Sequence, residues 1–420
     1  MVKNKNIGWR VTFAGVGVNL ALGVLYTWSV IAHGIPEEWG WSAADKALPY
    51  SVACFVFALA MIPAGRIQDR FGPRWVVTVG GVLMGGGLIF SSMVGSWLWG
   101  FVIGFGVITG MGIGFGYASA TPPAVKWFPP AKTGMIAGLV VAGFGLASVY
   151  IAPLATSLLR NVGLADTLFY LGIGFMVVVV VLAQFIKNPP PGYVPEGVKP
   201  AKTGSPASKG SVDKNWKEMI KTSQFWLLWT MYAFGSATGL MLIGIATPLG
   251  KASLGEAAFW AVVLLSVGNA GGRILAGTLS DKLGRQWTMF GAYVLQAFMI
   301  ITLIFVQNSA IMLLLIIMIA GANYGANLAL FPSATKDYFG LKNFGLNYGV
   351  MFTAWGVGGL ILPRINGMII DATGNSRITF VVAAILMVLA ALLTFVSRAV
   401  SNRSQDNEEI EAAEPAGVKA

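Results

Sequence analysis

The sequence predicts an all-α membrane protein, with twelve transmembrane helices in two pseudo-symmetric six-helix bundles. Hydrophobic residues make up 56% of the 420 residues, charged residues only 11%, and the mean hydropathy is +0.72. The apolar runs are about 20 residues long and interrupted by glycine, which suits spanning helices rather than the alternating strands of a barrel. A short motif recurs at about half the chain length, which indicates a duplicated six-helix unit.

The predicted spans follow one another with short polar connections. No small-residue cleavage site follows the basic start, so we interpret the first run as a spanning helix rather than a signal peptide. The twelve spans are Trp9–Ala32, Asp45–Arg66, Arg74–Gly95, Trp97–Ala120, Lys132–Thr156, Asp166–Lys187, Gln224–Leu249, Glu256–Leu279, Trp287–Val306, Ala310–Phe331, Phe344–Gly367 and Arg377–Arg398.

A linker and a tail complete the predicted domain organisation. Residues 188–222 are rich in Pro, Lys, Gly and Ser, as expected for a solvated cytoplasmic linker between an N-terminal bundle (1–187) and a C-terminal bundle (223–398). Residues 399–420 are polar and acidic, and we expect them to form a disordered cytoplasmic tail.

The net charge of +11 reflects membrane topology rather than nucleic-acid binding. Apart from the mid-span Arg273, the 28 Lys and Arg residues lie on the side of the two termini, except for Lys46, Arg160, Lys251, Arg364 and Arg377. By the positive-inside rule, both termini are cytoplasmic. We therefore expect a multi-pass protein of the bacterial cytoplasmic (inner) membrane, surrounded by the lipid bilayer.

Several classes of protein are excluded by what the sequence lacks. The single cysteine, Cys54, rules out an internal disulfide framework and a cysteine-based metal cluster. No phosphate-cradling loop, metal-ligand cluster or nucleophilic triad is found. We therefore expect no enzyme activity, no metal and no cofactor, and we expect a monomer.

Arg273 is the only formal charge in the middle of a predicted span. It lies roughly 12 Å from the polar flank at Asp281, close to the middle of a hydrocarbon core about 30 Å thick. A cation there costs roughly 2.5–3.5 kcal/mol. No acid lies near its depth on the same helix, which predicts a site whose anion comes and goes. Asn269, one turn earlier on the same face, is expected to share that anion or to orient the arginine.

The duplicated motif lies just after the second helix of each half. Gly65–Arg74 reads GRIQDRFGPR, and Gly277–Gln286 reads GTLSDKLGRQ. Two such halves suggest a transporter whose bundles rock around a mid-membrane site. Acids in these loops are suited to accept hydrogen bonds from neighbouring helix ends in one state and release them in another; a purely topological role is the alternative. The predicted switch residues are Gly65, Asp69, Arg70 and Gly72 in the first loop and Gly277, Asp281, Lys282 and Gly284 in the second.

Aromatic side chains share the depth of Arg273. A tyrosine in hydrocarbon requires a hydrogen-bond partner, and a carboxylate supplies one. Ordinary core packing, with the hydroxyls satisfied by the backbone, is the other interpretation. The candidate pocket residues of this kind are Tyr26, Tyr117, Phe144, Tyr324 and Trp355.

The motif Gly-x-x-x-Asp-Arg/Lys-x-Gly resembles the loop signature of the major facilitator superfamily. The stretch Asn269–Arg285 is similar to the eighth helix of the oxalate/formate antiporter family, relatives of the monocarboxylate transporters, and so are Val24–Trp28, Lys126–Pro129 and Leu330–Ser333. The resemblance implies the major facilitator fold and alternating access. It also implies that Arg273 is the substrate-binding arginine and that Tyr26, Tyr117 and Tyr324 are pocket walls.

Three positions depart from these families. The oxalate exchanger has a lysine in its eleventh helix and a glutamine in its first, where this chain has Trp355 and Leu25. Animal monocarboxylate transporters have an aspartate where this chain has Asn269. A dianion in a dry pocket requires two positive groups, because one leaves a buried net negative charge. Arg273 alone therefore favours a monocarboxylate.

We accordingly predict a secondary active transporter of small monocarboxylates of the lactate, pyruvate, acetate or formate type. None of the 17 acids is mid-helix, and His33 lies near a helix end. Proton symport, with the proton on the substrate carboxylate, is the favoured coupling, and exchange for a counter-anion is the alternative. Two other readings remain open at this point: an oxalate/formate-type organic anion exchanger and a non-transporting sensor with the same fold.

Overall fold

The protein is a bundle of long helices. The computed structural model describes residues 2–129, 132–190, 193–195, 213–306, 308–340 and 343–413, and the side chains of all of these except 2–6, 69, 133 and 401–413. Every regular element in these ranges is a helix. Eleven of the helical segments in them are long and apolar enough to cross a membrane, judged by length and composition.

The longest segment contains two of the predicted spans. Helix α7 runs over Thr133–Ala183, but Gly163 interrupts it with φ 77° and ψ −178°. Glycine adopts this backbone conformation at little steric cost. Each part of the segment is long enough to span the bilayer, so the predicted twelve-helix architecture is confirmed.

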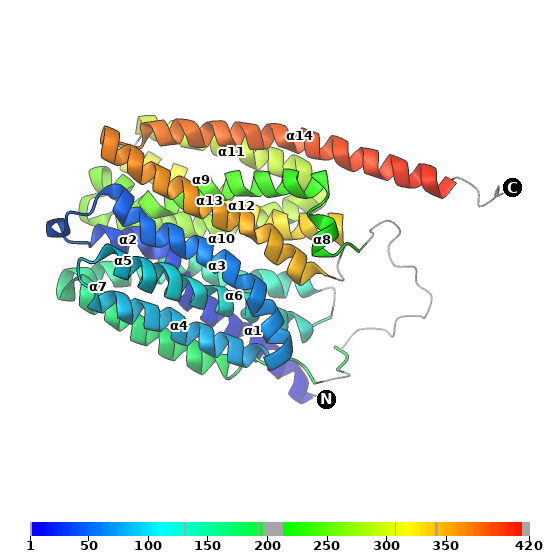
Figure 1. Ribbon diagram of the computed structural model, residues 1–420, viewed down its shortest axis with the longest axis horizontal. Coiled ribbons are helices and arrows are strands. Elements are labelled where there is room, and N and C mark those ends of the chain that lie inside the picture. Colours follow the sequence, from blue (N-terminus) through cyan, green and yellow to red (C-terminus); the bar gives the residue numbers. More distant parts are fainter. Residues whose placement is uncertain are drawn as a thin grey trace.

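The N-terminal half comprises the helices up to Ala183 (Figure 1). Its first span is not one regular helix, because a 3₁₀ segment separates two α-helical parts. Its fourth span also contains an irregular stretch, a π-helix. The elements are α1 (Val2–Leu22), η1 (Gly23–Thr27), α2 (Trp28–His33), η2 (Glu37–Trp39), α3 (Ala43–Phe71), α4 (Pro73–Met93), α5 (Leu98–Phe101), η3 (Val102–Thr109), α6 (Gly110–Lys126) and α7.

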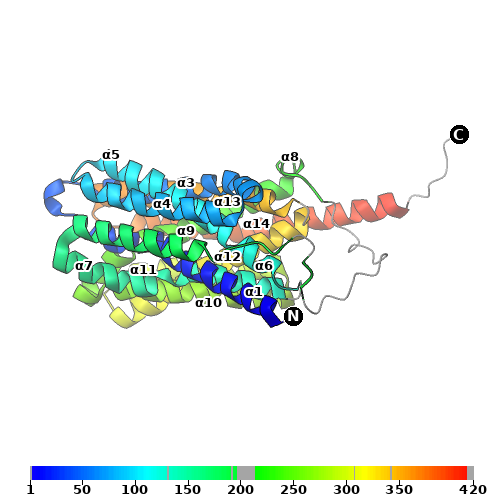
Figure 2. The same ribbon diagram turned by 90° about the horizontal axis from the view of Figure 1, so that it is seen from below.

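The C-terminal half is also built of long helices, and it lies beside the N-terminal half. The first helix begins and the last helix ends at the same end of the bundle, called here the termini end (Figure 2). The elements are α8 (Trp216–Met219), α9 (Ser223–Leu254), η5 (Gly255–Ala257), α10 (Phe259–Leu283), α11 (Arg285–Val306), α12 (Ala310–Phe339), α13 (Phe344–Thr373) and α14 (Arg377–Ala413).

The tail and the end of the linker differ from the predictions. We expected disorder after Arg398, but α14 continues to Ala413, because its Glu, Ala, Gln and Arg residues favour helix. We also expected a solvated linker, but Met219 in α8 is fully buried. The Asn347 side chain of α13 donates a hydrogen bond to the Lys214 carbonyl over 2.9 Å. Residues 191–192 and 196–212 of the linker lie outside the described residues.

The two repeated loops have the same backbone conformation. Gly72 has φ 84° and ψ 157°, and Gly284 has φ 87° and ψ 156°. These positive φ values favour glycine at both positions. In the second loop, Arg285 donates to Asp281 over 2.8 Å and to Asp337 over 3.0 Å, all within the C-terminal half. The Asp69 side chain lies outside the described residues, so the switch role of these loops stays a prediction.

Glycines bring α10 and α12 into close contact. A methyl group added at Gly268 or Gly272 of α10 would overlap a backbone carbonyl of α12, and one at Gly321 or Gly325 of α12 would overlap a carbonyl of α10. Each helix therefore presents a Gly-x-x-x-Gly pair to the other, the pattern that allows membrane helices to approach closely. Residues next to these glycines are held in fixed register.

The two halves are joined at the end opposite the termini. The Asp371 carboxylate at the end of α13 accepts hydrogen bonds from the backbone nitrogens of Ala43, over 2.7 Å, and Ala44, over 3.0 Å, at the start of α3. A carboxylate at a helix N-terminus satisfies free N–H groups and interacts favourably with the helix dipole. Arg364 adds an ion pair to Asp45 at 3.8 Å. These contacts hold the two halves of the described structure together at this end.

Candidate functional site

Arg273 lies between the two halves, on the face of α10 that points to α7. Its side chain is 8% exposed. Nε donates to Asn269 Oδ1 over 3.1 Å, and Nη1 donates across the interface to the Val141 carbonyl of α7 over 3.0 Å. Gly145 of α7 lies beside this contact, where an added methyl group would be 3.6 Å from Nε, an ordinary van der Waals distance.

Two buried donors at this point have no partner. The Nη2 group of Arg273 and the Nδ2 group of Asn269 are inaccessible and make no hydrogen bond of acceptable geometry. Among the described side chains, Arg273 also belongs to no ion pair. A buried cation without an anion is costly, and an unpaired buried donor adds to that cost. Both features fit a site that a carboxylate completes.

A chain of aromatic side chains extends from the guanidinium. Tyr117 of α6 lies close enough to interact electrostatically with the Arg273 guanidinium, but their geometry falls short of a well-formed hydrogen bond. The Tyr117 ring lies 5.2 Å from the ring of Phe144, in an edge-to-face arrangement, and Phe144 lies 4.9 Å from Tyr26 in the same manner. Edge-to-face geometry is a favourable arrangement of aromatic rings. The chain therefore connects α6, α7 and η1 within the N-terminal half.

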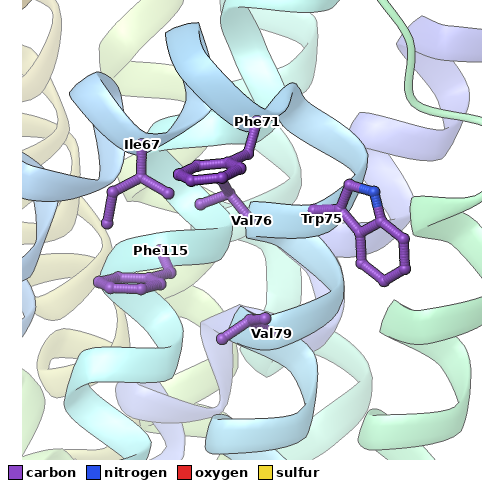
Figure 3. Close-up of a pocket in the computed structure, with 6 residues that line it drawn as sticks. All are labelled: Ile67, Phe71, Trp75, Val76, Val79 and Phe115. Atoms are coloured by element: carbon purple, nitrogen blue, oxygen red, sulfur yellow. The ribbon is translucent and has the colours of Figure 1, made fainter.

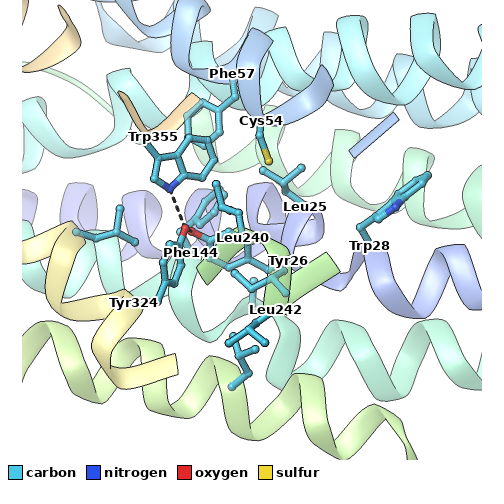
Figure 4. Close-up of a cluster of buried hydrophobic side chains, with 14 of the residues drawn as sticks. Leu25, Tyr26, Trp28, Cys54, Phe57, Phe144, Leu240, Leu242, Tyr324 and Trp355 are labelled. Atoms are coloured by element: carbon cyan, nitrogen blue, oxygen red, sulfur yellow. Dashed lines mark hydrogen bonds between the residues drawn. The ribbon is translucent and has the colours of Figure 1, made fainter. Parts of the chain in front are cut away.

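Hydrogen bonds continue this chain into the C-terminal half. The hydroxyls of Tyr26 and Tyr324 are 2.7 Å apart, and the Trp355 indole nitrogen donates to the Tyr324 hydroxyl over 2.8 Å. Figure 4 shows the indole nitrogen of Trp355 pointing at this hydroxyl. All three side chains are buried. The Tyr26–Tyr324 contact bridges the two halves at mid-depth.

The local backbone explains why Tyr26 is in this position. It lies on η1, the 3₁₀ segment Gly23–Thr27 that interrupts the first span. A methyl group at Gly23 would overlap Ala147 of α7, so glycine allows the segment to press against that helix next to Phe144. The 3₁₀ geometry differs from an α-helix in residues per turn, so it redirects the side chains that follow.

The structure brings seven predicted pocket residues into one connected set: Arg273, Asn269, Tyr117, Phe144, Tyr26, Tyr324 and Trp355. Leu25, the eighth, is fully buried next to Tyr26 in the chain. Their roles in binding stay predictions.

Three residues of this region were not among those predicted from the sequence. The ring of Phe57 lies 5.3 Å from Tyr117, 5.8 Å from Phe144 and 5.1 Å from Trp355. Phe352 stacks on Trp355 at 5.0 Å. Its position three residues before Trp355, on the same helix face, was a usable signal. Val141 contributes only its carbonyl, for which the sequence gives no signal.

A groove elsewhere on the surface is not part of this site. It has a volume of about 340 Å³ and lies between α3, α4 and α6 (Figure 3), lined by Ile67, Phe71, Trp75, Val76, Val79 and Phe115. Phe71 and Trp75 are largely exposed. Its lining is apolar, as expected of a surface that faces lipid.

The fold and the buried central cation define a class of protein: a multi-pass membrane protein built from two six-helix halves around a mid-depth polar site. The family model of the Major Facilitator Superfamily matches residues 12–259 and 233–419. The chain belongs to this superfamily, and it is a secondary transporter rather than an enzyme.

Curated relatives and solved structures agree with this assignment. The chain is 29% identical to the oxalate:formate antiporter of Oxalobacter formigenes, over 89% of this chain and 87% of the relative. It is 25% identical to human monocarboxylate transporter 11, over 92% and 82%. Among solved structures, a bacterial homolog of the human lysosomal transporter Spinster, in an inward-facing and unoccupied conformation, has the same fold. Its TM-score is 0.67 at 18% identity, covering 94% of this chain and 97% of that chain.

Proposed function

We propose that the protein transports small monocarboxylate anions and that Arg273 binds the carboxylate. The observation that carries this proposal is the pair of buried, unpartnered donors on Arg273 and Asn269. Nε is already held by Asn269 Oδ1 and Nη1 by the Val141 carbonyl, so the guanidinium is oriented before a ligand arrives. A carboxylate has two oxygens, which suit two adjacent donors. The name of monocarboxylate transporter 11 supports the same class of substrate, and the name of the oxalate:formate antiporter supports small carboxylates more broadly.

A single negative charge matches the polar groups around Arg273. Trp355 occupies the position where the oxalate exchanger family has its second cation, and it is neutral and fully buried. Its neighbours Tyr324, Phe57 and Phe352 are also uncharged. A second carboxylate here would have no cation to offset its desolvation. Leu25 and Phe144 add apolar surface for a short organic tail.

Coupling to protons is the favoured mode in this proposal. Asn269 occupies the position of a titratable aspartate in the animal transporters, so the substrate carboxylate itself is the proposed proton carrier.

The repeated loops, including Asp69 and Asp281, are proposed to switch contacts as the halves rock. We also propose a monomer in the bacterial inner membrane, with both termini and the linker in the cytoplasm, which matches the basic excess at the termini end.

Uptake of labelled pyruvate and lactate by proteoliposomes tests the proposed function. We expect uptake to rise when the outside is more acidic than the lumen, because each anion enters with a proton. Uptake that instead requires unlabelled anion inside, with no response to the pH gradient, would establish exchange in place of symport. Absence of uptake of either acid under both conditions would overturn the proposal. Protein-free liposomes and valinomycin-clamped membranes control for passive permeation and membrane potential.

An oxalate/formate-type exchange remains the second candidate, because Arg273 has no counter-ion among the described side chains and the antiporter relative carries both anions in its name. Trp355→Lys separates the two. Placing an ammonium at this buried position is expected to increase the affinity for oxalate by about tenfold or more, since close buried charge pairs are strongly coupled. The measurement is inhibition of labelled pyruvate uptake by oxalate. Trp355→Phe, which keeps an aromatic ring without a charge, is the control.

The charge argument is contradicted if oxalate inhibits the wild-type protein as strongly as pyruvate does. It is also contradicted if oxalate affinity is the same in the lysine and phenylalanine variants. The family assignment favours transport over the third candidate, a non-transporting sensor.

A further inference from the structure

The groove between α3, α4 and α6 is open on the surface of the N-terminal half (Figure 3). Ile67 and Phe71 come from the end of α3, and Trp75 and Val79 come from the start of α4. Phe71 is 59% exposed and Trp75 is 65% exposed. The volume of about 340 Å³ lies within the range of pockets that hold small ligands, about 300–1,000 Å³. The groove is therefore large enough to hold part of an apolar chain.

Positive charge surrounds the end of this groove that lies at the loop between α3 and α4. The segment Gly65–Arg74 contains three arginines and one acid, a net charge of +2. The arginines are exposed and belong to no ion pair between described side chains: Arg66, Arg70 and Arg74. The guanidinium carbon of Arg70 lies 5.3 Å from the centroid of the Phe71 ring, which lines the groove. A cation thus lies directly beside an apolar groove.

The groove continues from these charges toward the hydrocarbon core. Val79 follows Arg74 by five residues on α4, which places it about 7.5 Å further along the helix. Trp75 and Val76, between them, also line the groove and are apolar. A phospholipid has the same order of groups, with a phosphate at the surface of the bilayer and acyl chains below it. The chemistry of the groove therefore matches a phospholipid along its length.

The second half shows the equivalent position covered by the protein itself. Trp75 corresponds to Trp287 at the offset of 212 residues between the repeated loops. Trp287 packs edge-to-face against Phe395 of α14 at 5.9 Å, and the Arg398 guanidinium lies over its ring at 5.3 Å. Trp75 is the more exposed of the two, at 65% against 48%. The N-terminal half therefore leaves to a ligand the place that the C-terminal half fills with its last helix.

We propose that this groove binds an acyl chain of an anionic phospholipid and that Arg70 and Arg74 bind its phosphate group. Basic residues at the membrane surface attract anionic lipids more strongly than zwitterionic ones. With the termini in the cytoplasm, the lipid belongs to the inner leaflet. The inference concerns a site on the lipid-facing surface and does not depend on the substrate bound at Arg273.

Quenching of tryptophan fluorescence by brominated lipids tests the inference. The protein is reconstituted in phosphatidylcholine vesicles that contain the same low mole fraction of either brominated phosphatidylglycerol or brominated phosphatidylcholine. The difference between the wild-type protein and Trp75→Phe isolates the signal of Trp75 from that of the other tryptophans. We expect Trp75 to report an apparent affinity at least about fivefold higher for phosphatidylglycerol, the effect of one or two cations beside an anionic head group.

The double variant Arg70→Gln/Arg74→Gln removes the charge and keeps the groove. We expect the preference for phosphatidylglycerol to fall to about twofold or less, because the attraction of surface cations is lost. Lys282→Gln is the matched control. Lys282 is the exposed counterpart of Arg70 in the second repeated loop. It lies in the other half of the protein, so the control is expected to retain the wild-type preference.

Val79→Phe keeps the charges and fills part of the groove. We expect Trp75 to report at least about threefold weaker binding of phosphatidylglycerol in this variant, because less apolar surface remains for the chain. This variant distinguishes a lipid held in the groove from a general attraction of anionic lipids to the arginines.

Three results would each overturn the inference: equal quenching of Trp75 by the two lipids in the wild-type protein, an unchanged preference in the arginine double variant, or unchanged binding in Val79→Phe. If the double variant does not fold, Arg74→Gln alone decides, because it is also expected to reduce the preference. None of these results bears on the proposed function, which is measured by uptake.

Discussion

Replacing Arg273 with glutamine is expected to lower pyruvate uptake by at least about a hundredfold. The substitution removes the buried cation and with it the charge-assisted hydrogen bonds to a carboxylate. Removing one member of a buried, hydrogen-bonded charge pair costs about 2–5 kcal/mol. It also removes the hydrogen bond from Nη1 to the Val141 carbonyl, which orients the group across the interface. Glutamine retains part of the hydrogen-bonding capacity, so most of the loss is expected to come from the missing charge.

Initial rates of labelled pyruvate uptake into proteoliposomes, at matched protein incorporation, measure this effect. Arg377→Gln is the control, because Arg377 is an exposed cation at the start of α14, away from the central site. It is expected to transport at the wild-type rate. Thermal unfolding in detergent is expected to show the Arg273 variant folded, since a neutral side chain is less costly to bury than an unpaired cation. Uptake within threefold of wild type would exclude Arg273 as the carboxylate-binding residue.

Replacing Gly272 with alanine is expected to destabilise the C-terminal half strongly. The added methyl group would overlap the Ala322 carbonyl of α12, and backbone cannot move aside as a flexible side chain does. Overpacking of this kind typically costs about 1–3 kcal/mol, and the helices must separate to relieve it. Separation would also displace Arg273, the next residue on α10. We therefore expect both lower thermal stability and weaker pyruvate binding.

Gly271→Ala is the matched control for this variant. The two glycines are adjacent on the same helix, but a methyl group at Gly271 meets nothing within 4 Å. Alanine favours helix over glycine by roughly 0.5–1 kcal/mol, so the control is expected to be as stable as wild type or more stable. The measurements are the midpoint of thermal unfolding and the yield of monodisperse protein. Equal midpoints for the two variants would contradict the close packing of α10 and α12.

The fold was largely predictable because the membrane imposes strong constraints on sequence. Apolar runs of the right length gave the spans, and the repeat of Gly72 at Gly284 marked two halves whose turns have the same φ and ψ values. The errors occurred in polar segments, where no such constraint applies. The acidic tail resembles disorder in composition, yet its residue types also favour helix, and α14 continues through it to Ala413.

The sequence predicted which residues lie in the candidate site, but not which of them contact one another. Depth along each helix brought Tyr117, Tyr26, Tyr324 and Trp355 to the level of Arg273. Depth alone does not say which way a side chain points, so the hydrogen bond from Trp355 to Tyr324 had to come from the structure. The 3₁₀ segment around Tyr26 also lacks a sequence signal, because it results from close packing on α7. A backbone partner such as the Val141 carbonyl has no residue type to identify it.

The glycine contacts between α10 and α12 have a consequence for how a carrier treats the two faces of the membrane. Asn269 and Arg273 lie on α10, and Tyr324 lies next to Gly325 on the closely packed α12, so the guanidinium and the phenol are expected to move together. Under the proposed mechanism, a bound anion keeps its electrostatic partner through the whole cycle, and this part of its binding free energy cancels between the two facing states. Any difference in affinity between the two sides must then come from the neutral groups of the other half, Tyr26, Tyr117 and the Val141 carbonyl. Substitutions there would make the affinities on the two sides of the membrane unequal without changing the charge that the carrier recognises, while the gradients still set the direction of net flux.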